Sequence, residues 1–127
     1  MVDTIHTLFI SGYAGDNPEK ATIPFVLANI EVEDKTKRVE VVLMFEGVRM
    51  AIQGAADRFE VGVPFETHNL GARMRLFMDA GGVINVCTPC LIHRNLNEEP
   101  TMEGIVKISG RILMEKKDIA KKILTFV

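Results

Sequence analysis

The fold is decided by residues 38 to 45, Arg38-Val39-Glu40-Val41-Val42-Leu43-Met44-Phe45, a run of mostly apolar side chains. Its second half, from Val41 to Phe45, is apolar without alternation, which is typical of a strand buried on both faces. Such strands occur mainly in parallel sheets that helices cover on either side. The run therefore predicts an interior strand of a parallel sheet.

Further strands and helices are expected to alternate on either side of this run. The other expected strands are Thr4–Ile10, Val83–Val86, Gly104–Ser109 and Ile123–Val127. The first expected helix is capped by Asn17, has Pro18 at its first position and runs to about Glu33. A short helix is expected after Glu46-Gly47, with Val48, Ala51, Ile52 and Ala55 at helical spacing. The others are a helix from Leu70 to Met78, a turn of helix from Pro89 towards Asn95, and a helix from Arg111 to about Ala120. Pro24 is expected to kink the first helix or to mark a later start, and residues 58–66 and 97–100 are expected to be loops. This order predicts a single α/β domain over residues 1–127.

Composition excludes several classes of function. A net charge of -2 lacks the basic excess that nucleic-acid binding requires. No run reaches the roughly 18 apolar residues of a membrane span, and the N-terminus lacks the pattern of a signal peptide. Two cysteines three residues apart, without an export signal, favour the reducing cytoplasm over a disulfide framework. No glycine-rich nucleotide-binding fingerprint occurs, so no cofactor is expected.

The candidate site is Cys87-Thr88-Pro89-Cys90, which follows the expected strand Val83–Val86. Sites in open parallel sheets form beyond the carboxyl ends of strands. A cysteine at the start of a helix is stabilised as thiolate by the helix dipole, so we expect the pKa of Cys87 to lie below the free value of about 8.5. His93 and Arg94 follow one to two turns later and are expected to add positive charge.

Three other interpretations of this motif remain open. Both cysteines can be small core residues, or they can form a redox dithiol of the thioredoxin kind. They can also bind a metal together with His93 and His68, although a second close pair of ligands is lacking. His6 lies in an apolar strand and is expected to be a core histidine with its polar atoms satisfied.

The order of several segments resembles the DsrE/DsrF-like family across nearly the whole chain. The most specific is the strand that ends in Cys-x-Pro-Cys with Arg94 four residues after the second cysteine; the others are Asn17-Pro18-Glu19, residues 24–28, Phe45-Glu46-Gly47-Val48 and Ile123-Leu124-Thr125-Phe126. The resemblance implies a three-layer α/β/α fold on a five-stranded, mainly parallel sheet, assembled as trimers or hexamers. It also implies a role in sulfur relay, in which Cys87 matches a cysteine that carries a persulfide and Arg94 an arginine that follows it. Cys90 matches the second cysteine of the Cys-x-Pro-Cys subgroup. Asn95 replaces the glycine that many members have after this arginine, and it can adopt the same left-handed backbone conformation.

We therefore expect a cytoplasmic sulfur-relay protein that exchanges sulfur with donor and acceptor proteins and uses no cofactor. Sulfur transfer needs a thiolate that is nucleophilic and accessible, and we expect Cys87, at the start of a helix and exposed in a loop, to meet these demands. Cys87 is the expected acceptor, Cys90 the residue that receives the sulfur next or releases it by forming a disulfide, and His93 and Arg94 the residues that bind the substrate. Whether the protein turns over as a sulfurtransferase is left open. The alternatives are a non-catalytic binding or assembly subunit and a Cys/His metal-binding protein.

Overall fold

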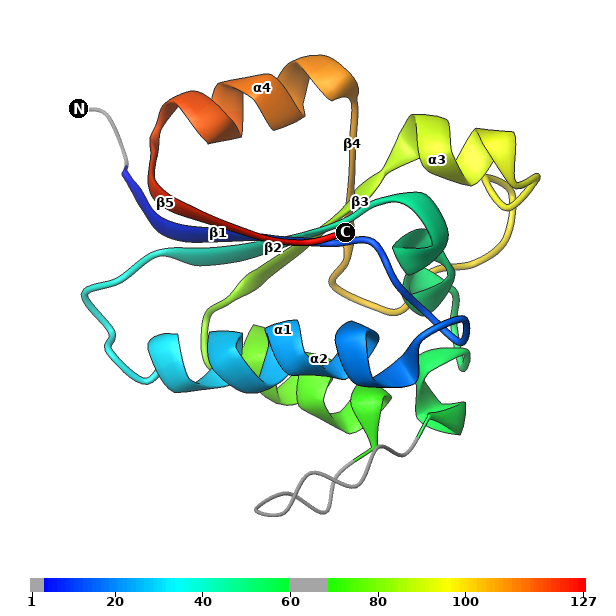
Figure 1. Ribbon diagram of the computed structural model, residues 1–127, viewed down its shortest axis with the longest axis horizontal. Coiled ribbons are helices and arrows are strands. Elements are labelled where there is room, and N and C mark those ends of the chain that lie inside the picture. The colour runs from blue at the N-terminus through cyan, green and yellow to red at the C-terminus, as the bar shows by residue number, and fades with distance from the viewer. Residues whose placement is uncertain (1–3, 60–68) are drawn as a thin grey trace.

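The computed structural model describes residues 4–59 and 69–127. Its centre is a five-stranded sheet, all parallel, in the order β4-β3-β2-β1-β5 (Figure 1). The strands are β1 (Ile5–Ser11), β2 (Val39–Leu43), β3 (Val83–Cys87), β4 (Val106–Ile108) and β5 (Ala120–Phe126). The helices are α1 (Pro18–Glu31), α2 (Leu70–Asp79), α3 (Thr88–His93) and α4 (Gly110–Asp118), with two 3-10 helices, η1 (Phe45–Ala51) and η2 (Ala56–Arg58). The predicted α/β class is confirmed.

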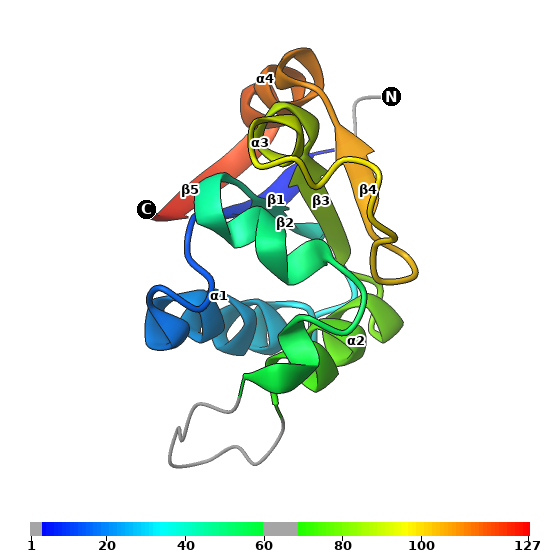
Figure 2. The ribbon, with the colours of Figure 1, turned by 90° about the vertical axis from the view of Figure 1, so that its right-hand side faces the viewer.

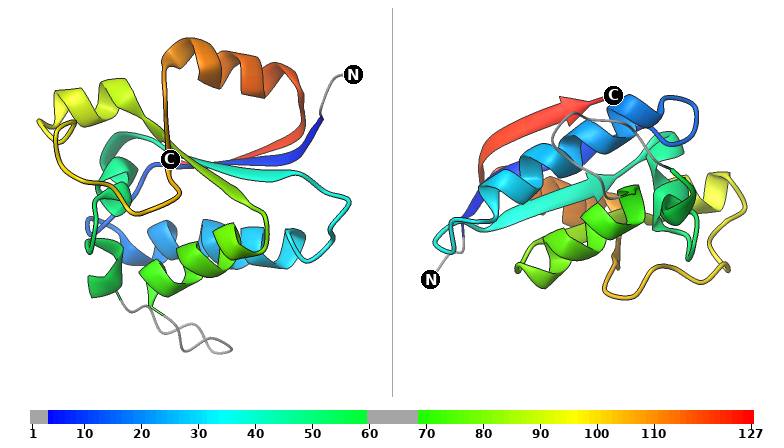
Figure 3. Two further views of the ribbon diagram at one scale, coloured as in Figure 1. Left: turned by 180° about the vertical axis from the view of Figure 1, so that it is seen from behind. Right: turned by 90° about the horizontal axis from the view of Figure 1, so that it is seen from below.

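The helices form two layers around the sheet. Helices α1 and α2 lie side by side on one face, and α3 and α4 lie on the other (Figures 1 and 3). The side-chain amide of Asn29 in α1 joins the first two helices by donating to the Arg73 carbonyl in α2, at 3.1 Å. The predicted three-layer α/β/α arrangement is therefore confirmed. No helix in the described ranges is long and apolar enough to cross a membrane.

The two faces of the sheet are buried to different degrees. The main core lies under α1 and α2, where the rings of Phe25 and Phe77 meet edge to face with centroids 6.3 Å apart. Among the described residues, the opposite face holds a smaller buried apolar cluster, which consists of Ile5, Leu8, Val42 and Ile108. Helix α4 covers this second face without burying any of its own residues. Its attachment therefore depends on contacts other than a deep apolar core.

One such contact is an ion pair to a carboxylate buried in the sheet. Glu40, in the central strand β2, is 1% exposed and accepts hydrogen bonds from Lys116 Nζ of α4 at 2.7 Å and from Asn85 Nδ2 of β3 at 2.9 Å. Arg38 Nε donates a third at 2.8 Å. Burial would raise the pKa of Glu40, but these three hydrogen bonds outweigh it and the pKa is lowered. Strand β2 therefore also carries the charged residue Glu40, whose ion pair with Lys116 attaches α4 to the sheet.

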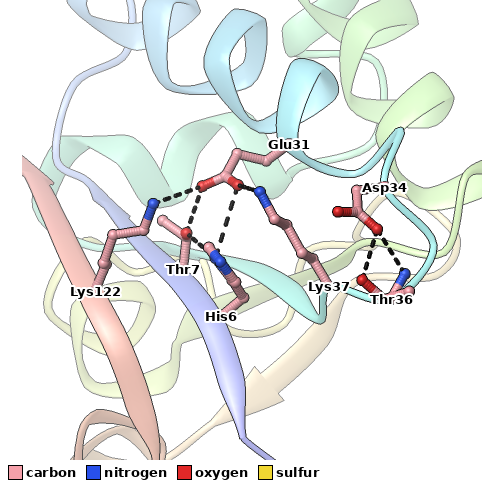
Figure 4. Close-up of polar contacts among 7 residues, drawn as sticks. All are labelled: His6, Thr7, Glu31, Asp34, Thr36, Lys37 and Lys122. Carbon is pink, nitrogen blue, oxygen red and sulfur yellow. Dashed lines mark hydrogen bonds and ion pairs between the residues drawn. The ribbon is translucent and has the colours of Figure 1, made fainter.

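A second polar cluster joins the end of α1 to the sheet, at the amino ends of β1 and β5 (Figure 4). Glu31 accepts from the hydroxyl of Thr7, lies 3.2 Å from Lys37 Nζ and 3.6 Å from Lys122 Nζ, and has His6 Nδ1 at 3.7 Å. Burial would raise the pKa of Glu31, but the hydrogen bonds and positive charges lower it. His6 is half-buried, at 23% exposure, so it is a member of this cluster and not of the apolar core that the sequence predicted.

Several element boundaries differ from the predictions. The short helix expected after Glu46-Gly47 is two 3-10 helices, because Ile52 between them is extended and pairs with Thr101 in an isolated antiparallel bridge. Strand β5 begins at Ala120, three residues before the predicted Ile123, because pairing with β1 already starts at Ile5 opposite Ala120. Helix α1 begins at Pro18, capped by Asn17 as predicted, and continues through Pro24. Of the loop expected over residues 58–66, Arg58 ends η2 and residues 60–66 lie outside the described residues.

Candidate functional site at the carboxyl end of strand β3

The two cysteines lie where β3 meets α3. Strand β3 ends at Cys87, which is the N-cap residue of α3, and Thr88 and Pro89 lead to Cys90. Figure 2 looks onto the carboxyl edge of the sheet, where α3 and η1 lie close to the strand ends. Both cysteines are free thiols. The sequence thus predicts the position of the motif correctly, with α3 starting at Thr88 instead of Pro89.

The environment of Cys87 differs from the prediction. Its side chain is 7% exposed and belongs to the main core. Burial, and then a hydrogen bond with the Cys90 side chain, raise the pKa of the Cys87 thiol from an ordinary 9.0 to about 11. The Cys90 amide N–H and the charge of Arg94 act in the opposite direction but do not compensate. The prediction of an exposed Cys87 with a lowered pKa is therefore wrong, because desolvation outweighs the effect of the six-residue helix α3.

Cys90 is the more accessible of the two thiols. It is half-buried and packs against the margin of the main core, one helical turn beyond Cys87. Residues three apart on a helix are neighbours on one side, which accounts for the contact between the two thiols. The structure therefore pairs a buried thiol with a partly accessible one.

Arg94 closes α3 onto the neighbouring helix η1. Its Nε donates to Glu46 Oε1 at 2.9 Å, and its Nη1 donates to the Cys90 carbonyl at 3.3 Å. Glu46 also accepts from Arg49 Nε at 2.6 Å, and these hydrogen bonds from Arg49 and Arg94 lower the pKa of Glu46. Arg94 is thereby held beside the cysteine pair with only 17% of its side chain exposed. The positive charge that the sequence predicts at the site comes from this residue.

Asn95 and His93, the residues on either side of Arg94, do not share its hydrogen bonds to the site. Asn95 has a φ of 58°, so it adopts the left-handed conformation that was expected where family members have glycine. His93 is exposed and makes no hydrogen bond or ion pair with either thiol. Glu46, from which the sequence predicted only the start of a short helix, also belongs to the site. Its position soon after the central strand, at the same sheet edge as Cys87, is the signal from which this role could have been predicted.

A hollow lies next to this site on the same edge of the sheet. It has a volume of about 330 Å³ and is bordered by Glu46 of η1 and Leu96 after α3. Its other lining residues are Ala14, Gly15, Asp16, Arg49, Met50, Ile52, Ala55, Arg58 and Phe59. Neither cysteine lines it, but Glu46 does, and Glu46 is connected through Arg94 to the Cys90 carbonyl.

The described residues offer little support for a metal site. Across residues 4–59 and 69–127, no group of three or more His, Cys, Asp or Glu side chains is arranged to hold a metal ion. Cys87, Cys90 and His93 therefore do not form the expected set of ligands. His68, the fourth ligand considered, lies outside the described residues.

The fold agrees with comparisons to known proteins. The sequence model of the DsrE/DsrF-like family matches residues 6–126, so the chain belongs to the DsrE/DsrF-like family. This membership suggests a function of the sulfur-relay type. None of the curated proteins matches the sequence.

Two solved structures share the fold. The YchN protein of E. coli superposes with a TM-score of 0.79 at 18% sequence identity, over 95% of this chain and 98% of that one. MTH1491 of Methanobacterium thermoautotrophicum, described as a protein of unknown function, gives a TM-score of 0.69 at 15% identity, over 96% and 99% of the two chains. At these identities the likeness establishes the architecture alone.

Proposed function

We propose that this protein carries sulfane sulfur as a cysteine persulfide and passes it to a partner protein. The observation that carries the proposal is the pair of free thiols in contact at the carboxyl edge of the sheet, with Arg94 held beside them. Sites in parallel α/β folds form at this edge. Membership in the DsrE/DsrF-like family supports the same class of function.

Cys90 is the better candidate for the first acceptor. The sequence-based expectation named Cys87, but that thiol is 7% exposed and has a raised pKa, whereas Cys90 is only half-buried. In the transfer, the Cys90 thiolate attacks a sulfane sulfur of the donor, a new S–S bond forms, and the donor leaves as a thiolate. The positive charge of Arg94, held near Cys90 by its hydrogen bond to the Cys90 carbonyl, is expected to stabilise an anionic persulfide there. His93 is exposed and stays a weaker candidate for substrate binding.

Intact-protein mass spectrometry tests the proposal. The reduced protein is exposed briefly to inorganic polysulfide, freed of reagent and mapped by peptide, beside the variants Cys90→Ser and Cys87→Ser. We expect one or more added sulfur atoms in the wild type and in Cys87→Ser, and none in Cys90→Ser. Absence of added sulfur in all three, under conditions that load a control thiol protein, would contradict a carrier function.

The proposal includes the setting in which the protein works. We expect sulfur donor and acceptor proteins as partners, a cytoplasmic location, and a homotrimer or homohexamer. Apolar side chains exposed on β5 and α4 support self-association: Ile123 is 39% exposed, Leu124 41% and Met114 54%. Light scattering tests the assembly, and a monomer that Ile123→Lys leaves unchanged would contradict it.

The second candidate is a non-catalytic assembly subunit. The burial of Cys87, together with the exposed apolar side chains of β5, favours it. It predicts normal assembly in a Cys87→Ser/Cys90→Ser double variant and no sulfur loading in the wild type. The same mass-spectrometry experiment therefore separates the two candidates.

A further inference from the structure

The arrangement of the two thiols assigns them different tasks. Cys87 is buried at the N-cap of α3, while Cys90 is partly accessible three residues later, on the same side of the start of the helix. A sulfur donor in solution therefore meets Cys90 first. A sulfur atom bound to Cys90 Sγ is then close to Cys87. A bulky thiol from solution reaches the buried Cys87 less easily than Cys90 does.

We infer that Cys87 is a resolving thiol, which converts a persulfide on Cys90 into an internal disulfide and releases sulfide. This inference rests on the proposed function, because it begins with a loaded Cys90. The sulfur bound to Cys90 then has two possible outcomes: it is transferred to a partner protein, or it is reduced and released as sulfide. It also reverses the roles expected from the sequence, in which Cys87 is loaded and Cys90 resolves.

The reaction balances within the chain. Cys87 loses its proton, and its sulfur attacks Cys90 Sγ. A Cys87–Cys90 bond forms while the bond from Cys90 Sγ to the outer sulfur breaks, and the outer sulfur leaves with the electron pair and takes up the proton. The sulfane sulfur is reduced to sulfide by two electrons, which come from the two cysteine thiols. A low-molecular-weight dithiol such as dithiothreitol must then reduce the disulfide before another cycle.

The environment of Cys87 makes this step slow near neutral pH. With a pKa of about 11, only about one Cys87 in ten thousand is a thiolate at pH 7. The fraction grows about tenfold with each pH unit up to that pKa. Release of sulfide is expected to follow the same slope, so the persulfide is long-lived at pH 7 and short-lived at pH 10.

The experiment follows three signals in the full-length protein loaded anaerobically with inorganic polysulfide and then desalted. These are sulfide in solution, the mass of the intact chain, and the Cys87–Cys90 disulfide by non-reducing peptide mapping, measured from pH 7 to pH 10. In the wild type we expect sulfide and disulfide to appear together, one per added sulfur, about tenfold faster per pH unit. In Cys87→Ser and Cys87→Ala we expect Cys90 to load and to keep its sulfur, with release at least about tenfold slower.

The outcomes separate this inference from the proposed function. If neither the wild type nor the variants gain sulfur, the proposed sulfur-carrier function is wrong. If Cys90 loads but the Cys87 variants lose sulfur as fast as the wild type, or if no disulfide accompanies release, the resolving role is wrong and the relay is unaffected. Oxidation of the unloaded protein with diamide gives an independent readout: an internal disulfide is expected, and its absence in folded protein would overturn the resolving role.

Discussion

The reactivity of Cys87 towards a small alkylating agent is the most direct test of the site's chemistry. At pH 8 a thiol with a pKa of about 11 is thiolate in about one molecule in a thousand, compared with about one in ten at the ordinary value of 9.0. We therefore expect Cys87 in the folded protein to react with iodoacetamide about 100-fold more slowly than an unperturbed cysteine. Its initial rate should rise about tenfold per unit between pH 7 and pH 10.

The assay is timed alkylation followed by fragmentation mass spectrometry of the peptide from Leu76 to Arg94, which contains both cysteines. Cys90 provides an internal comparison and should react first, because it is more accessible. Protein unfolded in urea is the matched control, and there the two cysteines should react at similar rates. A rate for Cys87 that levels off below pH 9, or that exceeds the rate for Cys90, would refute the argument from burial.

Three further predictions concern stability and are measured by urea unfolding. Glu40→Gln removes a buried charge that faces Arg38 and Lys116 and should lower the free energy of unfolding by about 3–5 kcal/mol. Glu46→Gln, at a partly exposed ion pair, should change it by less than about 1 kcal/mol, and equal effects of the two substitutions would contradict this difference. The pKa values of Glu40 and Glu31 are lower in the folded state than their ordinary 4.5. Their contribution to the free energy of unfolding is therefore complete above pH 4.5 and is lost as the pH falls through the folded-state pKa values. In Glu40→Gln this loss of stability in acid should be smaller than in the wild type. Phe77→Ala empties part of the core between α1 and α2 and should cost about 3–5 kcal/mol, and a loss below about 1 kcal/mol would show that the core closes over the gap.

Much of the fold could be predicted because it depends on local pattern. Mostly apolar runs mark β2 and β3, and capping residues mark the start of α1. The errors fall where distant segments pair. Ile52 is extended and not helical because it pairs with Thr101 in an isolated bridge. Strand β5 is longer than predicted because Ala120 pairs with Ile5 of β1. Pairing of this kind has no signature within a short window of sequence.

The site was predicted less completely for the same reason. The order of residues places Cys87 at the end of a strand, and that placement is correct. Its burial depends on the core that α3 and η1 complete together, and the position of η1 is fixed by Gly47, where a Cβ atom would collide with the Ser11 carbonyl. Glu46 becomes part of the site through the same packing, because it is brought within 2.9 Å of Arg94. No spacing rule in the sequence conveys these contacts.

The raised pKa of Cys87 suits a carrier better than the lowered value expected from the helix start. A persulfide next to a reactive thiolate would be converted at once into a disulfide and sulfide, and no sulfur would remain for a partner. Because Cys87 is buried and holds its proton, the sulfur on Cys90 would persist long enough to be transferred. Arg94 works against this protection, since its charge favours the Cys87 thiolate. Breaking the Glu46–Arg94 ion pair, which fixes that charge beside the thiols, is therefore expected to alter the balance between transfer and release without removing either cysteine.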